Sequence, residues 1–348
     1  VPILMSHLGR PGGEYKKEFS LKPAAKKLQE LVGSSVTFVP DCVGKESQKI
    51  RDRAEAGDIF LLENLRFHIE EKQNDPGFAK KLAGHSDIYI NDAFGTSHRE
   101  HASMVGVTEF VEKAAAGHLL LKELRMLVDI IEDPKRPFVA IIGGAKVSSK
   151  IGVIENLMEI CDKILIGGGM SGTFFTSLGI SQGESIVEYD RLDVARRILE
   201  KADAHSGIGG NIFLPIDNVV TDVITEDGLR RIVPYDQIPS NLQTVDIGPD
   251  TIARFKKEIE NAKTIIMNGP LGVFELDKFS QGTREIMRLL AERARKGVIV
   301  VIGGGDSAAA ARKFGFDDAM THISTGGGAS LKLMEGKSLP AVEALTEK

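Results

Sequence analysis

The sequence predicts an α/β protein of two domains, each with a mainly parallel sheet and helices on both faces, joined by a connector helix. Three observations predict this class. Short apolar runs alternate with amphipathic stretches, which is typical of βαβ units. A chain of 348 residues is long enough for about two domains, and 42% apolar residues can fill a core in each. A proline-rich break after a long amphipathic segment divides the chain.

The first third of the chain contains four short apolar runs, each followed by a polar loop. We expect strands at 1–5, 35–39, 58–62 and 87–90. Helical stretches are expected at 22–31 and 75–83. Because parallel strands present their carboxyl ends at one edge of a sheet, we expect the loops that follow them to meet there.

Basic residues follow three of these strand ends. Arg10, Arg66 and Arg99 each come shortly after an expected strand, so a parallel sheet would bring their guanidinium groups to one edge. Three planar guanidinium groups suit a small, multiply charged anion, because each pairs bidentately with carboxylate or phosphate. Further donors at this edge are His7, His98 and His101. The alternative is that each arginine is an independent surface residue.

The sequence gives little support to a metal site in this part of the chain. His98 and His101 have HxxH spacing, but no acidic or cysteine partner lies at ligand spacing, and Arg99 between them would repel a cation. Cys42 and Cys161 are far apart and belong to no CxxC motif. Metal and disulfide roles for the cysteines are therefore unsupported, and a reducing compartment is expected.

A long amphipathic segment at 117–132 predicts a buried helix, since its leucines recur with a period near 3.6. The prolines of 133–137 end it. We therefore place one domain at 1–116, a connector helix and linker at 117–137, and a second domain at 138–335.

Strand ends in the second domain are rich in glycine instead of arginine. The apolar run Phe138–Ile142 does not alternate, as expected of a strand covered on both faces, and Gly143 and Gly144 follow it. Lys146 and Lys150 would share one helix face if Lys146 opens a helix. Glycines at a helix N-terminus with two ammonium groups favour an oxyanion. The alternative is a tight turn before a solvated helix.

Four further glycine-rich loops follow apolar runs, at 167–169, 268–270, 303–306 and 326–328. Such loops favour a nucleotide-binding edge, and the alternative is close packing of helices on the sheet. Asp306 is a natural carboxylate for Mg²⁺ on substrate phosphates, or else an N-cap for a helix at 307–314. A hairpin is expected at 219–231, with Asp227-Gly228 in its turn.

A competing hypothesis is a nicotinamide-dependent oxidoreductase. The sequence GGGMSG at 167–172 satisfies the GxGxxG pattern, and Glu188 follows at a distance suited to a ribose contact. This hypothesis leaves the three arginines unexplained. The sequence contains no GxxxxGK[ST], which excludes a Walker-type phosphate loop.

Charge and hydropathy limit the other classes of partner. A net charge of −5 and a pI near 6.0 argue against a general nucleic-acid binder. No apolar run approaches the ~18 residues that span a membrane, and no leader is evident, so we expect a cytoplasmic protein without a membrane partner. The chain opens at Val1 in strand-like sequence, and we expect that an N-terminal piece precedes it.

Eight sequence blocks, in order along the chain, resemble the phosphoglycerate kinase family. They are SHLGRP at 6–11, LLENLRF at 61–67, NDAFGTSHREHAS at 91–103, IIGGAKVSSKI at 141–151, GGGM at 167–170, NGPLGVFE at 268–275, IGGGDS at 302–307 and STGGGASL at 324–331. The resemblance implies two Rossmann-like α/β domains in a monomeric glycolytic enzyme, with the tail 336–348 returning to the first domain. It also implies the reaction ATP + 3-phosphoglycerate = ADP + 1,3-bisphosphoglycerate, by in-line transfer with domain closure and Mg²⁺ as cofactor.

The resemblance assigns site residues position by position. Those implied to bind 3-phosphoglycerate are His7, Leu8, Gly9, Arg10, Arg66, His98, Arg99 and His101. Lys146 and Lys150 are implied to be catalytic, and Lys150 also to contact the nucleotide. The other implied nucleotide contacts are Gly168, Gly248, Asn268, Pro270, Glu275, Gly303, Gly304, Gly305, Asp306, Ser307 and Thr325, with Asp306 also the metal ligand.

The sequence departs from the family at its start. The family's opening strand and loop, which carry further substrate contacts, have no counterpart here. This leaves a third hypothesis, a truncated and inactive nucleotide-binding module, which would bind ATP without turnover. The missing opening strand also predicts an exposed edge in the first sheet.

Overall fold

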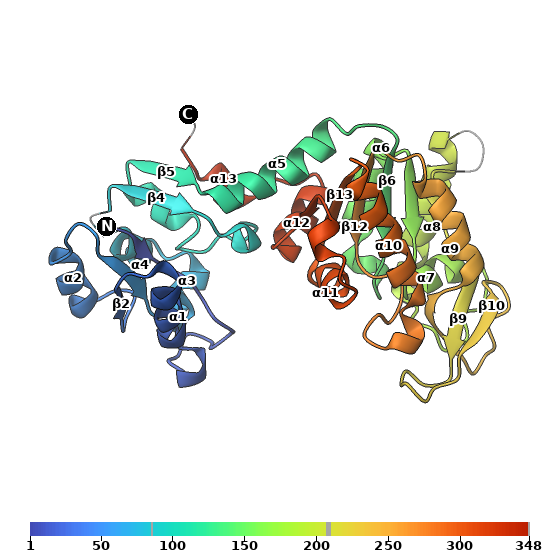
Figure 1. Ribbon diagram of the computed structural model, residues 1–348, viewed down its shortest axis with the longest axis horizontal. Helices are drawn as coiled ribbons and strands as arrows, with labels where there is room; N and C mark the ends of the chain where they lie inside the picture. The colour runs from blue at the N-terminus through green and yellow to red at the C-terminus, as the bar shows by residue number, and fades with distance from the viewer. Residues whose placement is uncertain (85, 207–209, 347–348) are drawn as a thin grey trace. The chain divides into compact units, whose positions relative to one another are not determined.

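The computed structural model describes residues 1–84, 86–206 and 210–346, which fall into two compact units (Figure 1). Unit 1 comprises Val1–Leu121 and Ser338–Lys348, and unit 2 comprises Lys122–Lys337. The expected helix at 117–132 is present as α5, His118–Glu132. Its first turn belongs to unit 1 and the rest to unit 2, whereas the sequence analysis set 117–137 apart as a connector.

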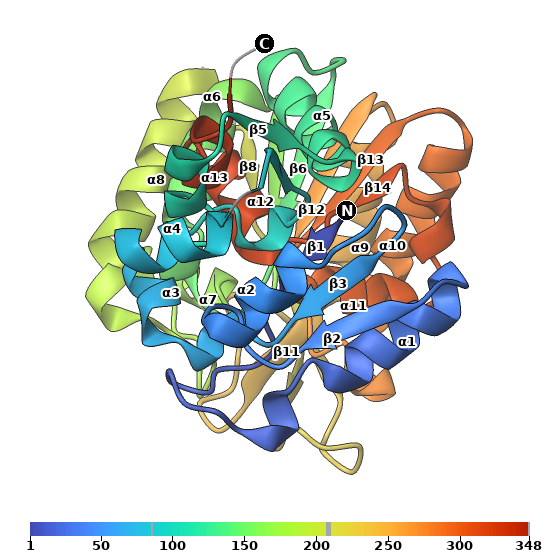
Figure 2. The same cartoon turned by 90° about the vertical axis from the view of Figure 1, so that its left-hand side faces the viewer.

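Unit 1 contains two small parallel sheets. The first has the order β1-β3-β2, with β1 at Ile3–Leu4, β3 at Ile59–Leu62 and β2 at Val36–Val39, side by side in Figure 2. The second pairs β4 (Ile88–Asn91) with β5 (Lys113–Ala116). All four expected strands are present, but among the described residues no ladder joins β1 to β4, so they form two sheets instead of one.

The helices of unit 1 begin and end at local signals. They are α1 (Lys22–Val32), α2 (Lys45–Asp52), α3 (Ile69–Gln73), α4 (Pro76–Ala83) and α13 (Pro340–Glu343). Gly33 ends α1 in the left-handed conformation at φ +66°. The Asp75 carboxylate caps α4 by accepting from the Phe78 N–H, and Phe78 packs in the core beside Leu62. The end of the chain packs on unit 1, where Thr346 N donates to the Ala114 carbonyl at 2.9 Å.

The main sheet of unit 2 is parallel, with six strands in the order β14-β13-β12-β6-β7-β8. These strands are β14 (His322–Ile323), β13 (Ile299–Gly303), β12 (Thr264–Asn268), β6 (Phe138–Ile142), β7 (Lys163–Ile166) and β8 (Ile212–Phe213). Every residue of β6 and β12 is buried, as their unalternating apolar sequences predict for strands covered on both faces.

Helices cover both faces of this sheet (Figure 1). They are α6 (Ile151–Ile160), α7 (Ser171–Ser177), α8 (Leu192–Ser206), α9 (Pro249–Ile259), α10 (Gln281–Arg295), α11 (Gly305–Lys313) and α12 (Gly327–Met334). On one face, Ile141 of β6 shares a core with Phe255 of α9 and Leu290 of α10. α6 contacts β6, β7, α8 and α12.

A second, antiparallel sheet of unit 2 has the order β10-β9-β11. Its strands are β9 (Asp217–Thr221), β10 (Arg231–Pro234) and β11 (Gln243–Ile247). The expected hairpin at 219–231 is confirmed, since β9 and β10 pair across a loop that contains Asp227-Gly228. The β11–β9 register shifts between Thr244 and Asp246, which leaves a β-bulge at Val245.

Across the described ranges, no helix combines the length and the apolar character that crossing a membrane requires.

Candidate active site

Unit 1 brings five basic side chains together at the carboxyl ends of β1, β3 and β4. We call the group the anion cluster; it consists of His7, Arg10, Arg66, Arg99 and His101. Burial lowers the pKa of His7 to about 4, and the positive charges of Arg66 and Arg99 add to this effect. Burial also lowers the pKa of Arg66, together with the charges of Arg99 and Arg10. Mutual effects of this kind require the groups to lie close together, as the strand-end pattern predicts.

Arg66 is the best anchored member of the cluster. The short 3-10 turn Leu65–Phe67 holds it directly after β3, and the Asn64 side chain caps the turn by accepting from the Arg66 N–H. Arg66 is 6% exposed, and its Nη1 donates to the Gly9 carbonyl at 2.8 Å. Its Nε is buried and has no hydrogen-bond partner among the described residues. A buried guanidinium N–H without a partner is a place where an anion would complete the hydrogen bonding.

The loop after β1 is fixed to the same turn through its backbone. Asn64 Nδ2 donates to the Leu8 carbonyl at 2.7 Å. Gly9 has φ +63°, and a Cβ there would fall 2.4 Å from the Phe19 ring, so only glycine fits. The carbonyl groups of the predicted residues Leu8 and Gly9 therefore bond to the turn 64–66, and the Leu8 side chain is 44% exposed.

The sequence analysis missed Glu71, an acidic residue that lies next to the anion cluster. Glu71 is 3% exposed, and its carboxylate accepts from the Ser103 N–H at 3.0 Å and hydroxyl at 2.6 Å. His101 Nδ1 lies 3.6 Å from Glu71 Oε1, and Arg99 Nε donates to His98 Nε2 at 3.3 Å. Glu71 supplies one negative charge against the cluster's positive charges. Its sequence signal, an acidic pair at the start of a short helix, also fits a solvated surface.

The glycine-rich loops of unit 2 lie along one edge of its parallel sheet, because each follows the carboxyl end of β6, β7, β12, β13 or β14. A Cβ on Gly143 would fall 2.1 Å from the Pro270 carbonyl oxygen, and one on Gly269 2.1 Å from the Gly143 oxygen. These glycines let neighbouring loops touch. At Gly144 and Gly305 no atom lies within 4 Å of an added Cβ. Contact between loops therefore explains Gly143 and Gly269, whereas Gly144 and Gly305 border open space.

Lys150 lies at this edge, but the prediction that Lys146 opens a helix is wrong. A 3-10 turn, Val147–Ser149, follows Lys146, and α6 begins only at Ile151. Lys150 therefore caps α6 instead of sharing a helix face with Lys146, which is exposed. Lys150 Nζ donates to Asn268 Oδ1. Burial lowers the pKa of Lys150, whereas the negative charge of Asp306 raises it, so the two groups lie near each other.

Asp306 is exposed in the first turn of α11 and makes no capping hydrogen bond. The alternative that it is the N-cap is wrong, because α11 already begins at Gly305 and Gly304 is the cap, at φ +91°. Ser307 is buried, and its hydroxyl accepts from the Gly269 N–H at 2.7 Å. The Asp306 carboxylate thus lies at the N-terminus of α11 and near the Lys150 ammonium group. This combination suits phosphates that bind together with a divalent cation.

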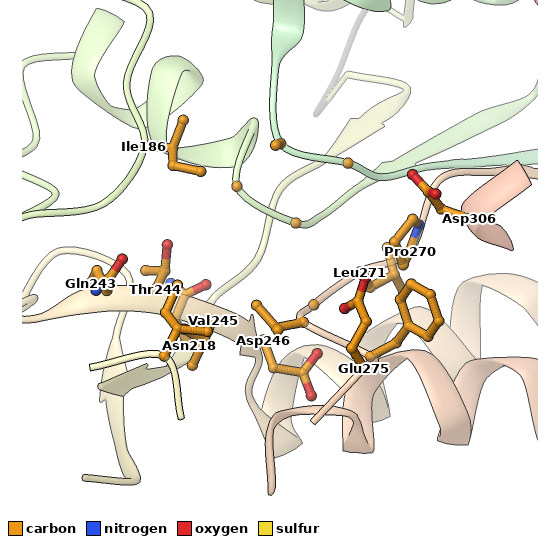
Figure 3. Close-up of a pocket in the computed structure, with 18 residues that line it drawn as sticks. Ile186, Asn218, Gln243, Thr244, Val245, Asp246, Pro270, Leu271, Glu275 and Asp306 are labelled. Carbon is orange, nitrogen blue, oxygen red and sulfur yellow. The ribbon is translucent and has the colours of Figure 1, made fainter. Parts of the chain in front are cut away.

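A cavity of about 210 Å³ extends from Asp306 through unit 2, and we call it the unit 2 cavity. Figure 3 shows Asp306 and Pro270 toward one end and Gln243 and Thr244 toward the other. The predicted residues Gly168 and Glu275 also line it. Burial raises the pKa of Asp246, in its wall, to about 8, although the Gly282 and Ile247 N–H groups donate to its carboxyl oxygens at 2.6 and 3.0 Å.

Two predicted nucleotide contacts have other partners. Gly248 is the N-cap of α9, and a Cβ on it would fall 2.2 Å from the Asp217 carboxyl group. Thr325 directs its N–H and its hydroxyl to Glu123 Oε1, at 2.6 and 2.7 Å, so neither group is available to a phosphate. The two assignments to the nucleotide stay predictions, since these contacts with Asp217 and Glu123 are seen without a ligand.

The dinucleotide fingerprint also has another explanation. Glu188 accepts from the Ser148 N–H at 2.9 Å and from its hydroxyl, so it holds the 3-10 turn before Lys150 instead of facing a ribose. The helix that follows the glycines, α7, has only 7 residues. The position of Glu188, which favoured a nicotinamide cofactor, is therefore explained by its hydrogen bonds to Ser148.

One group of potential metal ligands lies elsewhere in unit 1, at Asp41, Cys42 and His68. His68 Nε2 lies 2.8 Å from Asp41 Oδ1, and the Cys42 thiol donates to the Glu63 carbonyl at 2.9 Å. Each side chain thus has a partner within the protein, and we assign no ion to the group.

The comparisons with known proteins agree with this geometry. A family model described as phosphoglycerate kinase matches residues 1–337. The chain is 52% identical over 345 residues to phosphoglycerate kinase 3, cytosolic, of Arabidopsis thaliana, covering 99% of this chain and 85% of that protein. It is 51% identical over 344 residues to the phosphoglycerate kinase of Chloroherpeton thalassium, covering 99% and 86%.

Solved structures give the same result. The structure of phosphoglycerate kinase from Coxiella burnetii has a TM-score of 0.88 at 39% identity, covering 99% of this chain and 85% of that one. The Pyrococcus horikoshii phosphoglycerate kinase has a TM-score of 0.83 at 30% identity with the same coverage.

Proposed function

The chain belongs to the phosphoglycerate kinase family, and from this premise we propose which of its residues carry the reaction. It is an enzyme that transfers a phosphoryl group between ATP and 3-phosphoglycerate in glycolysis. Neither the oxidoreductase nor the inactive module is favoured by the comparisons.

We propose that the anion cluster binds 3-phosphoglycerate. The observation that carries this assignment is the buried Arg66 Nε without a partner, beside two further guanidinium groups. The substrate has a carboxylate and a phosphate, and the guanidinium groups supply paired donors for both. His98 Nε2 accepts a hydrogen bond from Arg99 Nε at 3.3 Å, and this bond orients the Arg99 guanidinium group.

ATP and ADP are proposed to bind along the glycine-rich edge of unit 2. The phosphates lie at the N-terminus of α11, beside Lys150 and the open backbone at Gly144 and Gly305. The ribose and base extend into the unit 2 cavity past Glu275. Asp306 would hold the family's divalent cation, which we propose to be Mg²⁺.

The transfer needs positioning and charge stabilisation instead of acid–base chemistry. A carboxylate oxygen of 3-phosphoglycerate attacks the γ-phosphorus of ATP, and the bond to the bridging oxygen breaks, with its electron pair leaving on ADP. The Lys150 ammonium group stabilises the charge on the transferring phosphoryl oxygens, and Asn268 Oδ1 holds it in place. Lys146, exposed on the same loop, is free to reach the phosphoryl group. A divalent cation held by Asp306 would neutralise charge on the phosphates.

The remaining properties are proposals as well. We propose a cytoplasmic monomer whose partners are ATP/ADP and 3-phosphoglycerate/1,3-bisphosphoglycerate, without nucleic acid or membrane. Light scattering after gel filtration tests the monomer. Domain closure stays a prediction, and small-angle scattering with and without both substrates tests it.

The test of the catalytic assignment is ADP formation with ATP, Mg²⁺ and 3-phosphoglycerate. We expect Lys150→Ala to lower kcat by about 10²-fold or more, because a charge that stabilises the transition state is lost. The matched control is Lys27→Ala, which removes an exposed lysine of α1 that pairs with Glu30. Wild-type turnover in Lys150→Ala would contradict the assignment.

A further inference from the structure

Lys313, the last residue of α11, bonds to the loop that carries Glu275. Its Nζ donates to the carbonyl oxygens of Phe274 at 3.1 Å and Glu275 at 2.7 Å, and it lies 2.8 Å from Asp277 Oδ1. An ammonium group has three donors, and these three acceptors match that number. A lysine that directs all its donors to four consecutive residues restrains the path of their loop.

The same loop is also fixed to the other end of α11. We call residues 269–277, which follow β12, the β12 loop. In the first turn of α11, the Ser307 hydroxyl accepts from the Gly269 N–H at 2.7 Å. Ser307 and Lys313 are separated by about 9 Å along the helix axis. α11 therefore fixes the β12 loop near its beginning and near its end.

Glu275 depends on this restraint for its position. Its side chain is exposed, and within the described ranges its carboxylate makes no hydrogen bond or ion pair. The backbone that Lys313 holds therefore places the carboxylate. Glu275 and Asp306 both line the unit 2 cavity, and in Figure 3 Pro270 of the β12 loop lies between them. One helix thus carries Asp306 in its first turn and restrains Glu275 from its last.

We propose that Lys313 is a positioning residue, which holds the Glu275 carboxylate where it accepts hydrogen bonds from the ribose hydroxyl groups of the nucleotide. The inference rests on the proposed nucleotide site, with the phosphates at the N-terminus of α11 and the ribose at Glu275. A carboxylate is a strong acceptor for hydroxyl donors, but only when it is held at hydrogen-bonding distance. In the part of the chain that the structure describes, Lys313 does not line the unit 2 cavity, so it acts through Glu275.

The test is calorimetric titration of ADP and of 2′,3′-dideoxy-ADP, which lacks both ribose hydroxyl groups, into the full chain and into Lys313→Met. Hydrogen bonds to a carboxylate should make the wild type prefer ADP by about tenfold or more. We expect Lys313→Met to lose most of this preference, because ADP binds more weakly while dideoxy-ADP binds as before. A role in folding alone would leave the ratio of the two affinities unchanged.

The matched control is Lys256→Met. It removes an ammonium group that pairs with Glu285 at 2.7 Å, on a side chain 30% exposed against 34% for Lys313. This variant should keep the wild-type ratio. Urea denaturation checks that the variants fold, and Lys313→Gln, which keeps two donors instead of three, repeats the measurement with a milder change.

A further variant, Glu275→Ala, separates this inference from the proposed nucleotide site. If the wild type does not prefer ADP, or if Glu275→Ala keeps the preference, the placement of the ribose is wrong and the inference is overturned with it. If Glu275→Ala loses the preference while Lys313→Met keeps it, the site stands and the positioning role of Lys313 is overturned. Loss in both variants, with no further loss in the double variant and none in Lys256→Met, supports that role.

Discussion

The anion cluster of unit 1 and the glycine-rich edge of unit 2 occupy equivalent places, the carboxyl ends of parallel strands, yet they are built from different parts of the chain. In unit 1, arginine and histidine side chains form the cluster, and the buried Nε of Arg66 has no hydrogen-bond partner among the described residues. In unit 2, glycines at the strand ends either let loops touch or leave open space. The same topology therefore supports two different strand-end surfaces, which we propose as two kinds of anion site.

This difference determines how each site responds to substitution. A side-chain site loses affinity when its guanidinium group is removed. A backbone site is part of the fold, because the loops that form it are in contact with one another. We therefore expect substitutions in unit 1 to act on binding, and substitutions at the touching glycines of unit 2 to act on stability first.

The largest expected effect is that of Gly269→Ala. Its Cβ would fall 2.1 Å from the Gly143 carbonyl oxygen, and its φ of +95° strains any other residue. We expect a loss of at least ~3 kcal/mol in the free energy of unfolding, measured by urea denaturation. Gly297→Ala is the matched control, since φ is +85° with no atom within 4 Å, and there the cost should be only ~1–2 kcal/mol. Equal losses in the two variants would argue against loop contact as the role of Gly269.

In unit 1, Arg66→Met should act mainly on substrate binding. We expect 3-phosphoglycerate to bind about 10–100-fold more weakly, because hydrogen bonds from a charged donor are lost. Calorimetric titration measures this, with Arg53→Met as a control at an exposed arginine of the same unit. An unchanged affinity in Arg66→Met would remove the anion cluster from the substrate site.

A smaller effect is proton uptake by His7. Burial and the neighbouring arginines lower its pKa to about 4, so it is neutral at pH 5.5 in the free protein. A bound anion offsets those positive charges and raises the pKa toward its usual value of 6.5, so between about pH 4 and 6.5 binding takes up part of a proton. Titration in two buffers of different ionisation enthalpy measures the uptake. It should be larger in the wild type than in His7→Gln, and equal uptake would contradict the prediction.

The sequence predicted the two α/β units and most of their elements because local signals determine them. The unalternating run Phe138–Ile142 and the proline-capped helix α4 are examples. The positions of Arg10, Arg66 and Arg99 after strand ends also predicted that these side chains lie close together, because a parallel topology brings strand ends to one edge.

Contacts between segments far apart in the chain could not be predicted from the sequence. The division of the first sheet in two, the partners of Gly248 and Thr325, and the place of Glu71 beneath the arginines all depend on side chains far apart in the chain. Nδ2 of Asn218 and Oγ1 of Thr244 are of the same kind, because only the folded structure shows that no described residue pairs with them.

The most direct test of the central claim is a crossed titration of 3-phosphoglycerate and ADP into Arg66→Met and Gly305→Val. Gly305 opens α11 and has no atom within 4 Å of an added Cβ, so valine fits the fold but occupies the space proposed for phosphate. We predict that Arg66→Met loses affinity for 3-phosphoglycerate alone and Gly305→Val for ADP alone. If either variant weakened both ligands equally, or if Gly305→Val bound ADP as the wild type does, the account would be contradicted.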